Sequence, residues 1–170
     1  MHWTERFGTH PGESVSRTDG RFSIHGVIRK IHIKTRLWDN RLCVQGIQVF
    51  LKDGTNHAFG MKENDMRDVT VLEVPKGQHI KNILLRSGWY IDKLGFMTDQ
   101  KIRLGPIGGP GGAQRDILYG LQLASEDLSD FYYIDGISGK VVQTQNAPAI
   151  CDLSFKIVVI KYSDIFVNEI

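Results

Sequence analysis

Apolar and polar residues alternate through much of this chain, and this alternation limits the folds it can adopt more than any other feature. Because successive side chains of a strand point to opposite faces, a period of two predicts half-buried strands rather than helices. Turn-forming pairs that end in glycine interrupt the alternation at short intervals. The alternating stretches are 28–33, 44–51 and 69–74, and the turn pairs are Asp53-Gly54, Lys76-Gly77, Asp135-Gly136 and Ser138-Gly139. The pattern predicts an all-β chain, a sandwich or barrel-like stack of antiparallel sheets.

Helical spacing is confined to one plausible segment, residues 113–128, and Gly120 in its middle weakens that helix. The chain has 170 residues, of which 41% are hydrophobic, which is enough for one domain with a core and too few for two. We therefore expect residues 1–170 to fold as a single domain.

The chain also repeats itself weakly, with a period of roughly fifty residues. Residues 28–49 align with residues 80–96, and residues 151–158 give a third copy of the second half of this unit. Each copy corresponds to about one small antiparallel sheet, which can bury its apolar face only against the others. We therefore expect three sheets packed around a common core.

Residues 88–92, with the sequence GWYID, are followed a short strand later by the glycine-rich run 105–112. An ionised carboxylate such as that of Asp92 can accept two charge-assisted hydrogen bonds at once from vicinal hydroxyls, which a sugar presents. Glycines lack a Cβ, so a ligand can closely approach the main-chain N–H donors. The aromatic rings of Trp89 and Tyr90 can cover an apolar sugar face. The combination suits a small polyhydroxylated ligand.

Each of these features also has an ordinary structural interpretation. An aspartate most often caps a turn, and a glycine run is most often a tight turn. A phosphate loop is excluded because no Lys-Ser or Lys-Thr pair follows the run and Gln114 stands where the last glycine of G-x-G-x-x-G belongs. Of the two adjacent aromatics, at most one can pack inward if the strand has begun, so we expect one to be exposed.

Residues 80–112 resemble one repeat of the jacalin-related lectins and are most similar to mannose-binding members of that family. The resemblance implies an all-β fold, a β-prism I of three antiparallel, Greek-key-like sheets with pseudo-three-fold symmetry. It also implies a sugar site in which Asp92 binds two sugar hydroxyls, backbone N–H groups donate to the ring side, and an aromatic side chain forms a wall. The carbohydrate-binding residues that it implies are Gly88, Trp89, Tyr90, Ile91, Asp92, Gly109, Gly111 and Gly112.

The other two repeats depart from this motif. In the first repeat, Gln45 stands at the position of Asp92 and residues 59–65 replace the glycine run, so we expect no site there. In the third repeat, Asp152 keeps the carboxylate but Pro148 takes the glycine position. Asp152 and Gly12 form a second candidate carbohydrate site. The resemblance is thin over residues 113–150, most of which the family pattern does not place.

Charge and motif content exclude several other functions. The chain has 21 Lys and Arg against 19 Asp and Glu, which is too balanced to favour a nucleic acid as the main partner. Its apolar stretches are too short for membrane insertion. The six histidines show no metal-ligand spacing, and neither a nucleophile elbow nor a paired catalytic carboxylate is recognisable. We expect no metal, no cofactor and no enzymatic activity.

Two further groups of residues leave alternatives open. Cys43 and Cys151 could form one disulfide, but free buried thiols are the commoner outcome in such apolar contexts. The basic residues near the motif form either a solvated face or a surface that favours an acidic or sulfated glycan. They are Arg86, Lys93, Lys101 and Arg103.

The leading functional hypothesis is a metal-independent lectin that recognises mannose-like or related glycans or glycoproteins. Because one shallow site binds weakly, we expect a homodimer that gains avidity. A protein-interaction or assembly module with eroded sugar sites is the alternative, and an accessory domain of a larger glycosidase is a weaker one. Residues 1–6 carry no apolar signal core, so we expect a cytoplasmic protein, or a secreted one if a leader was removed.

Overall fold

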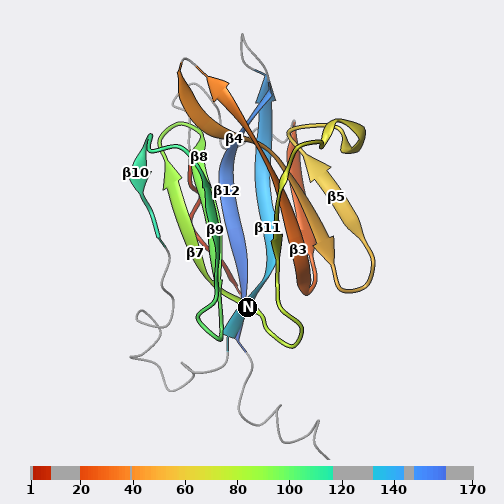
Figure 1. Ribbon diagram of the computed structural model, residues 1–170. Coiled ribbons are helices and arrows are strands. Elements are labelled where there is room, and N and C mark those ends of the chain that lie inside the picture. The colour runs from red at the N-terminus through yellow and green to blue at the C-terminus, as the bar shows by residue number, and fades with distance from the viewer. Residues whose placement is uncertain (1, 9–19, 39, 117–131, 144–147, 160–170) are drawn as a thin grey trace, which may run out of the picture.

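Three antiparallel sheets of four strands each enclose one apolar interior in the computed structural model (Figure 1). The structure describes residues 2–8, 20–38, 40–116, 132–143 and 148–159. The described part of the chain contains no helix with the length and hydropathy that a membrane span requires. Its one short helical turn is the 3₁₀ helix η1 (Glu63–Asp65). The predicted all-β class is confirmed.

The first sheet contains the alternating stretches nearest the N-terminus. Its strands lie in the order β5-β4-β3-β6, so the hairpin β3–β4–β5 is followed by a strand that returns beside β3. This order is that of a Greek key. The strands are β3 (Ile28–Trp38), β4 (Arg41–Leu51), β5 (Asn56–Phe59) and β6 (Thr70–Glu73).

The second sheet repeats this order one unit later in the sequence, as β10-β7-β8-β9. The strands are β7 (Ile80–Ser87), β8 (Ile91–Thr98), β9 (Arg103–Gly108) and β10 (Ala113–Gln114). Residues 113 and 114 therefore extend as an edge strand, so the start of the expected helix 113–128 was wrong. Residues 117–131, which held the rest of that helix, lie outside the described residues.

The third sheet joins the two ends of the chain, in the order β1-β12-β11-β2. Its strands are β1 (His2–Trp3), β2 (Arg21–His25), β11 (Tyr132–Gln143) and β12 (Pro148–Val159). If the strands are counted from β11, this order is the same Greek key. The N-terminal strands β1 and β2 then take the third and fourth places in it. Residues 132–143, which sequence analysis did not place, are thus a central strand of the third sheet.

The interior is filled by the inward-facing side chains of all three sheets. Residues from every sheet form one cluster of buried side chains, with Ile31 and Ile47 from the first, Ile83 and Leu94 from the second, and Leu153 from the third. The rings of Phe96 and Phe155 meet edge to face, with centroids 6.2 Å apart. None of the sheets could bury its apolar face alone, which confirms the three-fold packing expected from the repeat.

A β-bulge occurs at the same place in each of the three long hairpins. The pairing between the two strands skips Gln45 in β4, Asp92 in β8 and Asp152 in β12. A bulge bends its strand and redirects a side chain away from the regular pleat. The carboxylate position of the motif therefore lies in a bulge in each repeat.

Candidate functional site

The segment Gly88–Tyr90 forms the turn between β7 and β8, at the end of the molecule where the turn between β3 and β4 also lies (top of Figure 1). The Gly88 N–H donates to the Tyr90 carbonyl at 3.2 Å, which closes the turn. Ile91 follows with a fully buried side chain that joins the apolar core. Ile91 thus anchors the turn, and only its backbone lies near the motif.

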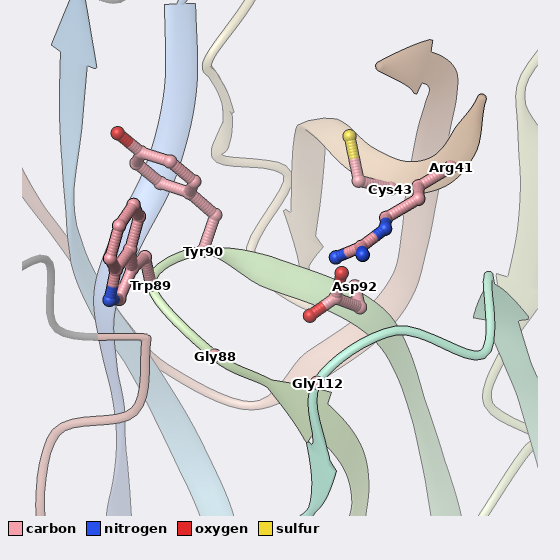
Figure 2. A pocket seen from close by; sticks show the side chains of 7 residues that line it. All are labelled: Arg41, Cys43, Gly88, Trp89, Tyr90, Asp92 and Gly112. Carbon is pink, nitrogen blue, oxygen red and sulfur yellow. The ribbon is translucent and has the colours of Figure 1, made fainter. Parts of the chain in front are cut away.

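Asp92 lies in the β-bulge directly after this anchor. Its carbonyl accepts a hydrogen bond from the Gly109 N–H at 2.9 Å, so the start of β8 is tied to the glycine run. Its carboxylate points into a pocket rather than into the core (Figure 2). The bulge and this backbone contact together set the direction of the side chain.

The glycine run lies directly against the Asp92 carboxylate. A Cβ at Gly111 would lie 2.6 Å from Oδ1, and one at Gly112 would lie 2.5 Å from Oδ2. Gly112 also has a φ of +68°, a left-handed conformation that residues with a Cβ resist. Only glycine fits these positions without displacing the carboxylate.

Arg86 holds the glycine run in place. Its Nε donates to the Gly111 carbonyl at 3.1 Å and its Nη2 donates to the Gly112 carbonyl at 2.8 Å. The guanidinium is therefore committed to the loop backbone. Arg86 therefore does more than contribute to a solvated basic face, because it binds the loop backbone next to the motif.

These elements border a cavity of about 520 Å³, which lies within the range typical of small-molecule sites. The residues that line it are Arg41, Cys43, Gly88, Trp89, Tyr90, Asp92 and Gly112 (Figure 2). The structure thus brings together five members of the predicted set at the cavity, while Ile91, Gly109 and Gly111 are not among its lining residues. Arg41 and Cys43 were missed, because they come from β4 of the preceding repeat.

The two aromatic side chains have different surroundings. Tyr90 packs against a small buried cluster of Val142, Ala149 and Cys151 in the third sheet. Trp89 is 59% exposed. The expectation that one of the pair is exposed is confirmed, and both lie across the pocket from Asp92 (Figure 2).

Burial shifts the acid–base behaviour of two side chains in the pocket. Partial burial raises the pKa of the Asp92 carboxyl, an effect opposed by the charge of Arg41, the backbone hydrogen bond of Gly88 and the charge of Arg86. Burial also raises the pKa of the Cys43 thiol, whose Sγ–H donates to the Arg36 carbonyl at 3.6 Å. Both cysteines are buried, and they are not joined to each other by a disulfide, as expected.

In the first repeat, methionines lie beside the corresponding bulge. Gly60 approaches the carbonyl of Gln45 just as Gly108 approaches that of Asp92, so the two loops are equivalent. A Cβ on Gly46 would then lie 3.1 Å from both Met61 and Met66. These side chains occupy the neighbourhood where the second repeat has its glycine run.

The corresponding position of the third repeat, Asp152, differs from those of the first two. Asp152 is 2% exposed, has a φ of +50°, and places Oδ2 3.6 Å from Nη2 of Arg21. Its N–H donates to the Gly8 carbonyl at 3.2 Å. Gly12, the other member of this candidate site, lies outside the described residues.

Among the described residues, no three His, Cys, Asp or Glu side chains gather in a way that could hold a metal ion. The polar groups of the residues that line the Asp92 pocket include a carboxylate, a guanidinium and loop backbone. Such groups accept from and donate to hydroxyls directly.

Comparison with solved structures identifies the architecture. Malaysian banana lectin matches with a TM-score of 0.62 at 13% identity, over 94% of this chain and 99% of that one. This chain has the β-prism fold. A mannose-binding jacalin-related lectin from Ananas comosus matches with a TM-score of 0.59 at 14% identity, over 94% and 98% of the two chains.

A lamprey immune protein matches with a TM-score of 0.60 at 18% identity, over 93% of this chain. The present chain spans 43% of the length of that protein. No family model and no curated protein sequence matches the chain. The resemblance expected from residues 80–112 is therefore confirmed for the fold.

Proposed function

We propose that this protein is a carbohydrate-binding protein that holds a mannose-like terminal sugar at Asp92. The observation that carries the proposal is the placement of an ionisable carboxylate against the bare backbone of Gly111 and Gly112 at the edge of an open cavity. Solved β-prism proteins of similar fold include a mannose-binding jacalin-related lectin, which supports the same ligand class.

In this proposal, Asp92 accepts hydrogen bonds from two vicinal sugar hydroxyls, and backbone N–H groups of Tyr90 and Ile91 donate to the ring side. Gly88 and Gly112 keep the entrance open because a side chain at either position would narrow it. Trp89 and Tyr90 form the wall opposite the carboxylate (Figure 2). Binding requires neither a metal nor a reaction.

A glycan array with wild type, Asp92→Asn and Asp53→Asn tests the proposal. Asp53 is a matched control, since its carboxylate accepts from the Thr55 N–H at 2.8 Å in an exposed turn of the first sheet. Hydrogen bonds to a charged group are worth enough that Asp92→Asn is expected to weaken binding roughly tenfold or more. Asp53→Asn is expected to bind like wild type, and equal binding by all three proteins would refute the site.

The proposal extends to the assembly and to the second candidate site. A single exposed pocket binds a monosaccharide weakly, so a homodimer would supply avidity on multivalent glycans. Asp152→Asn, assayed beside Asp92→Asn, measures whether the third repeat contributes. Light scattering of the purified protein gives the oligomeric state.

A protein-interaction module is the second candidate function. It is favoured by the methionines that lie beside the bulge of the first repeat and by the contact of Asp152 with Arg21. This alternative predicts that wild type and Asp92→Asn bind no glycan on the array. A glycan signal that depends on Asp92 would reject it.

A further inference from the structure

Arg41 reaches the candidate site from a different repeat. Asn40, with a φ of +62°, turns the chain between β3 and β4 in a conformation that asparagine tolerates. Arg41 is the next residue and pairs with Trp38 at the start of β4. The turn thus places the arginine at the rim of the pocket formed by the second repeat.

The guanidinium of Arg41 lies on the same side of the pocket as the carboxylate of Asp92, and Trp89 and Tyr90 lie on the other side. Figure 2 shows the guanidinium extending over the cavity toward Asp92. Its charge opposes the rise in the pKa of Asp92, so the two groups interact through space. Within the described residues, however, neither of the ion pairs found involves Arg41. The two groups face each other without closing into a salt bridge.

The two arginines near the pocket therefore have different roles. Arg86 donates to two carbonyls of the glycine run and is fixed behind the loop. Arg41 is exposed and lines the cavity. A guanidinium presents a planar fork of donors that matches the oxygens of a carboxylate or a sulfate.

We propose that Arg41 makes this site selective for glycans whose terminal sugar carries an anionic substituent, a carboxylate or a sulfate. This inference rests on the proposed function, because Asp92 must hold the hydroxyls of the same sugar. The hydroxyls of the sugar then face Asp92, while the anionic substituent of the same sugar contacts Arg41.

The test is titration calorimetry with three ligands that differ at one carbon: methyl α-mannoside, its 6-sulfate and the corresponding methyl uronide. Wild type is expected to bind the anionic ligands about five- to tenfold more tightly than the neutral one, as a charge-assisted contact at a partly exposed site allows. Arg41→Gln is expected to bring this ratio close to one, and Arg41→Lys to an intermediate value. Whether the sulfate or the uronide shows the preference identifies the substituent.

Arg103→Gln is the matched control, because Arg103 is an exposed arginine on β9 that does not line the pocket. It is expected to keep the wild-type ratio. The inference is overturned if Arg103→Gln removes the preference as fully as Arg41→Gln does, since the net charge would then be responsible. It is also overturned if Arg41→Gln weakens the binding of all three ligands equally. Arg41 would then act only by stabilising the ionised form of Asp92.

The outcomes separate this inference from the proposed function. Binding of the neutral mannoside that depends on Asp92, without any preference for anionic ligands, rejects the role of Arg41 alone. Absence of binding by all three ligands rejects both. A preference that weakens as ionic strength rises is expected for a direct ionic contact.

Discussion

At the scale of single residues, Asp92 shows a conflict between binding and stability. Burial raises its pKa in spite of two nearby arginines, so the folded protein holds the ionised form less favourably than the unfolded chain does. A charge kept under such conditions is typical of a functional site rather than of a stabilising one. An aspartate whose only role was to cap a turn would gain no stability from partial burial of its charge.

Asp92→Asn is therefore expected to unfold at the same or a slightly higher denaturant concentration at neutral pH. The free energy of unfolding is expected to rise by at most about 1 kcal/mol, because the site is only partly buried. Because the folded pKa is raised, wild type gains stability as the pH falls through it, so the advantage of the variant shrinks on acidification. Urea titrations at several pH values measure both effects. A clearly less stable variant at neutral pH would show that the charge supports the fold.

Trp89 and Tyr90 offer a second comparison, because they share the pocket and differ in packing. Trp89→Ala is expected to change stability by less than about 0.5 kcal/mol, as at other exposed positions, and to weaken sugar binding about two- to tenfold. Tyr90→Ala removes contacts with Val142 and its neighbours and is expected to lose about 1–3 kcal/mol of stability as well. Melting curves and calorimetry on the two variants separate the effects, and similar losses of stability would contradict this division.

The sequence predicts some of these residues and misses others for a physical reason. Asp92 and the glycine run lie close together in one repeat, so a local pattern reveals them. Arg41 and Cys43 reach the pocket only because β4 of the first sheet lies beside β8 of the second, a contact that local patterns do not encode. The burial of Asp152 likewise depends on its neighbours in the folded third sheet.

At the scale of elements, most of the longer strands are predicted from alternation or from the repeat, whereas the shortest edge strands are not. The hairpin β3–β4 carries the alternating stretches 28–33 and 44–51, and the hairpin β7–β8 is recognised from the repeat. Strands β1 and β10 have two residues each, too few for a periodic signal. The edge strand at Ala113 takes the place of the start of the expected helix because its backbone pairs with β7 at Ser87.

Gly112→Ala tests the element that forms the site. The new Cβ would lie 2.5 Å from both Oδ2 of Asp92 and the carbonyl carbon of Ser87, at a φ of +68°. We expect a loss of stability of about 2 kcal/mol or more together with loss of sugar binding.

Gly77→Ala is the matched control for this glycine. Its φ is +81°, yet nothing lies within 4 Å of the added Cβ, so only the backbone strain remains. We expect about 1 kcal/mol of destabilisation and unchanged sugar binding. Equal effects of both variants on binding would show that the close approach of Gly112 to Asp92 is not required.

At the scale of the whole molecule, three sheets share one core, and the third is assembled from both ends of the chain. A sheet that buries its apolar face only against the others has no separate stability. The ring contact between Phe96 and Phe155 joins the second sheet to the third inside this core. The three sheets are therefore expected to unfold together.

The three tryptophans allow this cooperativity to be measured, because each belongs to a different sheet. Trp38 ends β3 in the first sheet, Trp89 lies in the turn before β8 in the second, and Trp3 lies in β1 of the third. Variants that keep one tryptophan and replace the others with phenylalanine report on one sheet at a time. We expect their fluorescence transitions in urea, each compared with circular dichroism of the same variant, to coincide. An earlier transition at Trp3 would show that the strand from the N-terminus joins the third sheet without sharing the stability of the core.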